Sequence, residues 1–227
     1  TAVTLSCPLS SRKLLQQELM VQEVQTMNKG RLIIFSAPSG CGKGTMLEQI
    51  LKDDNFCVSV SATTRSPREG EIDGVNYHFL STDDFMSRID NGDFLEYASY
   101  CDNFYGTLRS EVDRMLEQGK NVILEIEVQG ALKVMKKCPT ALSVFIAPPS
   151  VGELRRRLHK RGTESDEVIE KRIAQSSREI ALASKYDYII INDALEDAVD
   201  DFFSVVRAEQ LRAENSAETI IGVISNS

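Results

Sequence analysis

Residues 36–45 read Ser-Ala-Pro-Ser-Gly-Cys-Gly-Lys-Gly-Thr, and this stretch directly follows the apolar run Leu32–Phe35. The apolar run predicts a buried strand, and the apolar spacing in residues 46–51 predicts a helix. A glycine-rich turn between a strand and a helix directs consecutive backbone N–H groups at one anion, and the helix dipole strengthens the attraction. An ordinary strand-to-helix turn is the alternative interpretation. Because the required strand and helix are both readable, we favour a phosphate-binding loop in a nucleotide-binding protein.

The glycines of the loop let the backbone turn, and Lys43 is placed to reach the outer phosphates of a nucleotide as a compact point charge. The usual pattern begins with glycine and places Ser or Thr after the lysine, but this chain has Ala37 and Gly44 there. The hydroxyl on the magnesium side is therefore expected from Thr45. We expect ATP to be bound by consecutive residues of the loop, which are Ala37, Pro38, Ser39, Gly40, Cys41, Gly42, Lys43, Gly44 and Thr45.

A cysteine lies inside this loop, at the start of the expected helix. Thiol pKa values are commonly lowered at helix N-termini. One hypothesis is therefore that Cys41 is reactive, and that its oxidation or alkylation blocks ATP binding. The alternative is that Cys41 is a small residue tolerated at a variable position of the loop.

Length, charge and cysteine content restrict the class of protein. A chain of 227 residues is long enough for one large α/β domain or for a core with insertions. Its net charge of −8 argues against nonspecific nucleic-acid binding, which usually requires a basic surface. The five cysteines lack paired spacing and the two histidines lie far apart, so we expect no zinc site, no disulfide framework and a cytoplasmic location. No apolar run approaches the roughly 18 residues of a spanning helix, so we expect no membrane partner.

Strands and helices alternate after the first helix, in the order that builds a parallel sheet. We expect strands at residues 57–60, 121–126, 142–146 and 188–191, and helices at residues 128–137, 151–160, 167–184 and from 195 onwards. The expected fold is α/β, with a P-loop kinase core whose parallel sheet is flanked by helices. Residues 28–60 and 119–227 would form this core, and residues 1–27 a dispensable N-terminal extension. Residues 61–118 interrupt the alternation, and their polar composition predicts an inserted subdomain that faces a polar ligand.

This inserted segment holds a second group of motifs. Ser-Ala-Thr-Thr-Arg-Ser-Pro-Arg-Glu-Gly-Glu occupies residues 61–71, and Gly-Val-Asn-Tyr, Phe-Leu-Glu and Asn-Phe-Tyr-Gly-Thr end at residues 77, 96 and 107. In these motifs and their order the chain resembles the guanylate kinases, from about residue 30 to about residue 212. The resemblance implies transfer of a phosphoryl group from ATP to GMP, and also to dGMP, in purine nucleotide metabolism. It places around GMP the residues Ser61, Arg65, Arg68, Tyr77, Glu96, Tyr105, Thr107 and Glu127.

The residue types of this expected site fit GMP. Arg65 and Arg68 are spaced to converge on its phosphate, where guanidinium groups bind and neutralise a dianion. Guanine presents N–H donors that a carboxylate such as Glu96 accepts, whereas adenine would leave that carboxylate unpaired, and such sites reject analogues by roughly 10⁴-fold. Taken singly, each arginine or acid fits a solvated, salt-bridged surface equally well. Their joint occurrence with Tyr77 and Tyr105 favours the binding site.

Two acidic residues follow the strand expected at residues 121–126. Ligands bind at the carboxyl ends of strands in open parallel sheets, so we expect Glu125 and Glu127 beside the phosphate loop. In guanylate kinases the first acid of this motif usually is Asp and lies near magnesium, and the second helps to read guanine. Because Glu125 is longer than Asp and Gly44 lacks a hydroxyl, we expect Thr45 and Glu125 to act on Mg²⁺ mostly through bound water.

Basic residues are densest between residues 155 and 172. We interpret Arg155 and Arg156 as a solvated helix face. Three further arginines match the lid arginines of the family, and these are Arg157, Arg161 and Arg172. The resemblance implies that a lid at residues 157–171 closes over the transferring phosphoryl group, stabilises its charge and excludes water.

The reaction implied by the resemblance needs no dedicated general base, because a phosphate monoester with a second pKa of about 6 is mostly a dianion at neutral pH. Positioning and charge neutralisation carry the rate, with Lys43, Mg²⁺ and the lid arginines as the expected cations. Near the C-terminus, Ile-Asn-Asp at residues 191–193 resembles the adenine-side loop of the family. We therefore expect Asn192 to contact the adenine base.

Two other classes of function are the alternatives. A kinase for AMP or a pyrimidine nucleotide would keep the loop and the lid, but would lack the Thr-Thr-Arg-Ser-Pro-Arg motif with Glu96. A noncatalytic scaffold module usually has a degraded phosphate loop, whereas Lys43 and the lid arginines are present here. We therefore expect an enzyme that uses ATP, GMP and Mg²⁺, and that acts as a monomer or a homodimer.

Overall fold

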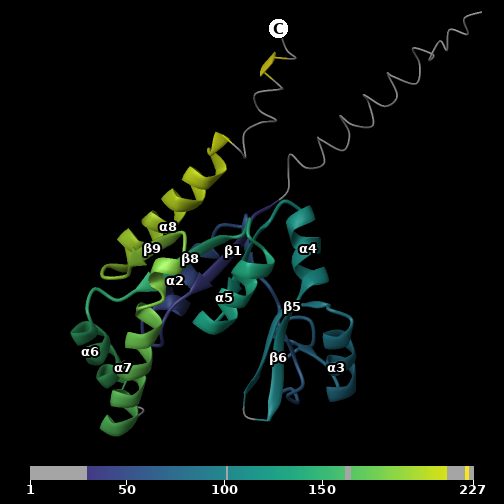
Figure 1. Ribbon diagram of the computed structural model, residues 1–227, viewed down its shortest axis with the longest axis horizontal. Coiled ribbons are helices and arrows are strands. Elements are labelled where there is room, and N and C mark those ends of the chain that lie inside the picture. The colour runs from purple at the N-terminus through teal and green to yellow at the C-terminus, as the bar shows by residue number, and fades with distance from the viewer. Residues whose placement is uncertain (1–29, 101, 162–164, 214–222, 225–227) are drawn as a thin grey trace, which may run out of the picture.

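A parallel five-stranded sheet forms the centre of the protein in the computed structural model, with the strand order β2-β7-β1-β8-β9 (Figure 1). The structure describes residues 30–100, 102–161, 165–213 and 223–224. The strands are β1 (Leu32–Ser36), β2 (Phe56–Val58), β7 (Asn121–Glu125), β8 (Leu142–Ala147) and β9 (Tyr188–Ile191). In β1, Ile33 lies opposite Ile123 of β7 and opposite Leu142 of β8. The strand that precedes the phosphate loop is therefore the central one.

Helices cover both faces of this sheet, which explains why its strands are nearly continuous apolar runs. One face packs against α2 (Lys43–Ile50), α6 (Val151–Arg161), α7 (Asp166–Ile180) and α8 (Leu195–Gln210). The other face packs against α4 (Arg109–Glu117) and α5 (Val128–Lys137). The predicted α/β fold, with a parallel sheet flanked by helices, is confirmed.

Most predicted elements have nearly the observed bounds, and β9 and α5 have the predicted ones. The helix predicted at residues 167–184 is too long, because α7 ends at Ile180 and a 3₁₀ turn follows at Ala183–Lys185. The reason is tertiary: Tyr186 is buried, and its ring packs against the ring of Phe145 with 5.1 Å between their centroids. Holding Tyr186 against the sheet requires the chain to leave the axis of α7.

A second sheet lies beside the first in Figure 1, within the segment predicted as an insertion. Its strand order is β4-β3-β6-β5, and the strands are β3 (Ala62–Thr63), β4 (His78–Phe79), β5 (Phe94–Tyr100) and β6 (Asn103–Leu108). Helix α3 (Thr82–Asp90) packs on it through Phe85, whose ring stacks on that of Phe94 at 4.4 Å. The second sheet thus has a small hydrophobic core of its own.

Two glycines show how differently the chain uses this residue. Gly30 precedes β1 and donates a backbone hydrogen bond of 2.8 Å to Leu116. A Cβ atom at Gly30 would collide with the backbone carbonyl of Lys120, so the close approach of these segments requires glycine. At Gly44, by contrast, a Cβ atom would meet no described heavy atom within 4 Å, so this glycine is replaceable on steric grounds.

Some predictions fall outside the described residues. These are the N-terminal extension at residues 1–27 and the part of the lid at residues 162–164. Within the described ranges, none of the helices combines the length and the apolar composition needed to cross a bilayer.

Candidate active site

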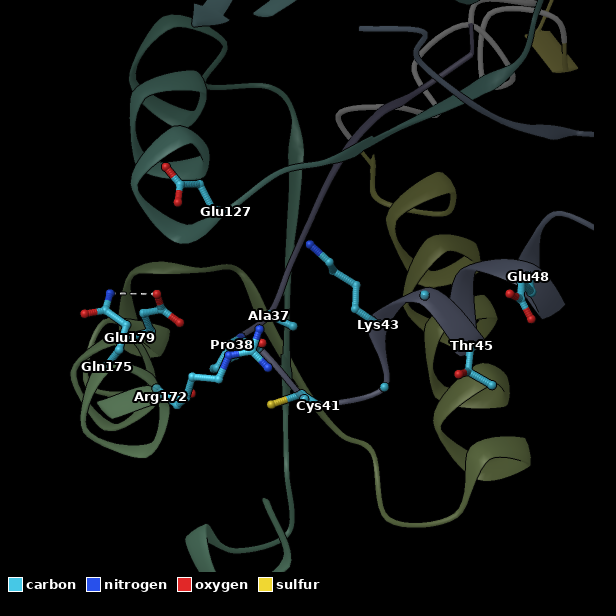
Figure 2. Close-up of a pocket in the computed structure, with 15 residues that line it drawn as sticks. Ala37, Pro38, Cys41, Lys43, Thr45, Glu48, Glu127, Arg172, Gln175 and Glu179 are labelled. Atoms are coloured by element: carbon cyan, nitrogen blue, oxygen red, sulfur yellow. Dashed lines mark hydrogen bonds between the residues drawn. The ribbon is translucent and has the colours of Figure 1, made fainter. Parts of the chain in front are cut away.

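The phosphate loop joins β1 to α2 and lines a pocket of about 640 Å³. All the loop residues predicted to bind ATP, from Ala37 to Thr45, line this loop pocket, and α7 closes its far side (Figure 2). Gly40 and Gly42 have φ values of 92° and 80°, in the left-handed region that favours glycine. The predicted arrangement, in which a strand is followed by a glycine-rich turn and then by a helix, is therefore confirmed.

Lys43 points into the loop pocket from the start of α2, on the side where Glu127 lies (Figure 2). Burial lowers the pKa of Lys43, and the nearby carboxylate of Glu125 opposes this effect. The Lys43 Nζ atom lies 3.7 Å from an oxygen of Glu125. A lysine held in this way is a localised positive charge at the end of the sheet where ligands bind.

Cys41 is fully buried in the hydrophobic core, in the same cluster as Leu154 and Leu158 of α6. Burial raises the pKa of its thiol to about 12. The expected lowering of the thiol pKa is therefore wrong, because burial outweighs the nearby positive charges of Arg157 and Lys43. The alternative of a small residue within the loop agrees with this packing.

A second pocket, of about 470 Å³, lies on the other side of the loop. It is lined by Gly40, Gly42, Thr45, Arg157, Lys160, Asn192, Asp193 and Leu195. Asn192 is buried, and its side-chain Nδ2 donates a 2.8 Å hydrogen bond to the backbone oxygen of Cys41. Arg157 donates through Nη1 to the backbone oxygen of Asn192 at 2.9 Å. We call this hollow the nucleoside pocket.

The predicted lid arginines occupy different places. Arg172 of α7 lines the loop pocket, whereas Arg157 lines the nucleoside pocket and also bonds to Glu153 at 2.7 Å. Arg161 ends α6, and its side chain is outside the described structure. Arg157 and Arg172 therefore line different pockets. Their roles in closure of the lid stay predictions.

The prediction that Arg155 and Arg156 form a solvated helix face is confirmed. Arg155 pairs with Glu170 at 2.9 Å and Arg156 pairs with Glu153 at 2.7 Å, with 45% and 66% of the two arginine side chains exposed. Hydrogen bonds from Arg156 and then Arg157 lower the pKa of Glu153 to about 2. Exposed pairs of this kind contribute little to stability.

A third pocket, of about 210 Å³, lies between the two sheets and is lined by Glu125. Three residues predicted to bind GMP line it, namely Ser61, Tyr77 and Thr107. Glu96 is not among the lining residues but contacts one of them: it is only 9% exposed and accepts a 2.9 Å hydrogen bond from Thr107 Oγ1. Burial raises the pKa of Glu96, and the bond from Thr107 opposes the rise. We call this hollow the acceptor pocket.

Arg65 lies over Tyr77, a lining residue of the acceptor pocket, and is fixed there by a partner that the sequence analysis missed. Its Nη1 and Nη2 atoms donate to the two carboxylate oxygens of Glu71 at 3.0 and 2.9 Å. The guanidinium also lies over the ring of Tyr77, 5.4 Å from its centroid, and that ring packs 6.0 Å from the ring of Tyr105. Arg65, Tyr77 and Tyr105 are thus brought together as predicted.

Arg68 takes part in this arrangement through its backbone. Its N–H donates to Glu71 at 2.7 Å, while its side chain is exposed. These bonds lower the pKa of Glu71, with the side-chain bond from Arg65 as the largest cause. An acid three residues after an arginine in a turn was the available signal for Glu71.

Two buried serines were also missed. Ser59 lines the acceptor pocket and Ser176 lines the loop pocket, and neither hydroxyl has a hydrogen-bond partner within the described part of the chain. Their positions offered a weak signal, because Ser59 lies two residues before Ser61 in an extended segment and Ser176 lies one helical turn after Arg172. Buried unpaired hydroxyls are candidates for ligand contact.

A phosphate loop after the central strand of a parallel sheet, with a second polar pocket facing its lysine, defines a P-loop kinase with two substrate sites. The family described as guanylate kinase matches residues 29–209. The chain belongs to the guanylate kinase family. It is accordingly an ATP:GMP phosphotransferase, as its predicted motifs implied.

Individual relatives agree with this assignment. The chain is 47% identical to the guanylate kinase of Clostridium perfringens strain SM101, over 89% of this chain and 94% of that protein. It is 45% identical to the guanylate kinase of Desulfitobacterium hafniense strain Y51, over 86% of this chain and 98% of that protein. The crystal structure of guanylate kinase from Anaplasma phagocytophilum superposes with a TM-score of 0.62 at 34% identity, covering 82% of this chain and 88% of that one.

Proposed function

We propose that the phosphates of ATP occupy the loop pocket and that GMP occupies the acceptor pocket beside Glu125. The observation that supports this arrangement is the ion pair between Lys43 and Glu125, whose charged atoms lie 3.7 Å apart. Lys43 lines the loop pocket and Glu125 lines the acceptor pocket, so the pair joins the two sites. The γ-phosphoryl group of ATP would then pass to GMP beside Lys43.

The acceptor pocket, together with the residues that contact its lining, offers donors and acceptors that suit GMP. Arg65, with Tyr77 and Tyr105 against it, supplies positive charge and hydroxyl donors for the phosphate. Glu96 supplies a buried carboxylate for the N–H donors of guanine, and Thr107 holds that carboxylate in place. Because these contacts go to the base and the phosphate, we expect dGMP to be accepted as well.

Mg²⁺ is the cofactor that suits the residues at the loop. The exposed Thr45 and the Glu125 carboxylate present oxygen donors, which this ion prefers. In the described part of the chain, no group of three or more His, Cys, Asp or Glu residues is arranged to hold a metal. We propose that substrate phosphates and water supply most of the ligands of the ion. When bound, it would neutralise phosphate charge.

The lysine and arginine side chains of the site have different proposed roles. Lys43 and Arg172 line the loop pocket and would neutralise charge on the transferring phosphoryl group. Arg157 lines the nucleoside pocket, so its place favours a role beside the adenosine of ATP. Arg161 stays a proposed lid residue, and closure of residues 157–171 would exclude the water that otherwise accepts the phosphoryl group.

The arrangement of the chain follows from these roles. We propose residues 28–60 and 119–227 as the ATP-binding core and residues 61–118 as the GMP-binding subdomain. The second sheet and its own core support the latter. The free cysteines Cys41, Cys57 and Cys138 agree with a reducing compartment, and we propose the cytoplasm, with the enzyme acting as a monomer or a homodimer.

A coupled assay of ADP formation with GMP, dGMP, AMP and CMP as acceptors tests the proposed substrates. Lys43→Ala should lower kcat by about 10²-fold or more while GMP binding, measured by calorimetry, stays largely intact. Lys52→Ala is the matched control, because Lys52 is exposed and bonds to Gln49 on the surface. A wild-type kcat in Lys43→Ala would refute the assignment of the loop, and turnover of AMP in preference to GMP would refute that of the acceptor pocket.

A further inference from the structure

Asn192 is held tightly at the end of β9. Its backbone N–H donates to the carbonyl of Ala147 at 2.8 Å, and its own carbonyl accepts from Arg157. Only 5% of the residue is exposed. The side chain therefore has a fixed place between β9, α6 and the phosphate loop.

The side-chain amide of Asn192 is already bonded to the phosphate loop. Nδ2 donates to the carbonyl oxygen of Cys41 at 2.8 Å, across a sequence separation of 151 residues. A carbonyl oxygen can only accept, so the amide nitrogen has to face it. In a planar trans peptide the C=O and N–H groups point in opposite directions. The bond therefore turns the N–H of Gly42 away from Asn192.

The second contact concerns Gly42 itself. This residue has a φ of +80°, and a Cβ atom on it would collide with Nδ2 of Asn192. The loop backbone thus packs directly on the amide group that bonds to it. Gly42 also lines the loop pocket, where free backbone N–H groups are the expected phosphate ligands.

We propose that Asn192 is a positioning residue that sets the peptide between Cys41 and Gly42 for phosphate binding. It acts on ATP through the loop and the phosphates, because its Nδ2 donor is already bonded to the carbonyl oxygen of Cys41. The proposal rests on the proposed function, since it takes the loop as the site of the ATP phosphates. It changes the role of Asn192 from recognition of the base to organisation of the loop.

Two ligands that each lack one part of ATP separate these roles. Inorganic tripolyphosphate has no base, and adenosine has no phosphate. In calorimetric titrations, Asn192→Ala should weaken ATP and tripolyphosphate by the same factor, about 3- to 10-fold for one buried hydrogen bond. Adenosine affinity should be unchanged. In the coupled assay, the KM for ATP should rise while the KM for GMP stays the same, a split that general loss of structure would not produce.

A second variant keeps the shape of the side chain. Asn192→Asp replaces the donor with a carboxylate oxygen facing the Cys41 carbonyl, and should weaken tripolyphosphate more than Asn192→Ala does. Ile191→Thr is the matched control, because Ile191 is the preceding residue of β9 and is 50% exposed. It should leave all three affinities unchanged.

The outcomes are distinct. Weaker adenosine binding with unchanged tripolyphosphate binding in either Asn192 variant would establish a base contact and overturn the proposal. Unchanged binding of all three ligands in both variants would also overturn it. If tripolyphosphate and ATP do not compete on the wild-type enzyme, the proposed function of the loop fails instead.

Discussion

Replacing Thr107 with valine tests how the enzyme selects guanine. Thr107 donates one hydrogen bond of 2.9 Å to the carboxylate of Glu96, and both side chains are buried. Valine has nearly the same shape but no hydroxyl, so the carboxylate loses a charge-assisted bond. Such bonds contribute about 1.5–3 kcal/mol, and about 1.4 kcal/mol corresponds to a factor of ten. The KM for GMP should therefore rise, with the full bond energy setting an upper limit of about 100-fold, and the KM for ATP should be unchanged.

The pH dependence of the same assay makes the test sharper. Burial raises the pKa of Glu96, and we propose that guanine binds the ionised form, so the KM for GMP should rise as the pH falls through that pKa. In Thr107→Val the rise should begin at a higher pH, because a bond that favours the ionised form is gone. Thr107→Ser is the control that keeps the hydroxyl. A wild-type KM for GMP in the valine variant, or an equal defect in the serine variant, would refute the reasoning.

Three further predictions follow from the contacts described above. Glu71→Gln should raise the KM for GMP in the coupled assay and leave that for ATP unchanged, because an amide cannot accept both bonds from Arg65; equal shifts in both constants would contradict this. Gly30→Ala should lower the free energy of unfolding, measured in urea, by about 1–3 kcal/mol through overpacking. Gly44→Ala should raise it by up to about 1 kcal/mol. If Gly30→Ala proved more stable than Gly44→Ala, the packing argument would be wrong. Cys41 should resist iodoacetamide in the folded protein and react in urea, as mass spectrometry would show; rapid labelling of the native enzyme would contradict its burial.

The phosphate loop and the parallel sheet were predictable because their signals are local. A buried strand at Leu32–Phe35, a glycine-rich turn and a lysine lie within a short stretch of chain. The strand Tyr188–Ile191 and the helix Val128–Lys137 carry continuous or periodic apolar patterns with clear ends. The helix at residues 167–184 was overextended, because its end depends on how Tyr186 packs against a distant strand.

The contacts that organise the site were not predictable in the same way. The bond from Asn192 to Cys41 spans 151 residues, and the local sequence around either residue does not predict it. The burial of Cys41 depends on leucines that α6 brings over the loop. In the second sheet, β3 and β4 each have two residues, too few to give a periodic signal. Local sequence therefore identified the residue types of the site, and tertiary packing decided their partners.

The pairing of β1 also has a consequence for synthesis of the chain. Leu32 lies in register with Val122, and Ile33 lies in register with Leu142. The central strand β1 therefore pairs with two strands, β7 and β8, that are synthesised much later. The entropy of closing a loop grows slowly with its length, and the intervening segment has its own small core. On the ribosome, the phosphate loop gains both neighbouring strands only after β8 has emerged. Nucleotide that binds the folded loop can then stabilise this nearly complete sheet.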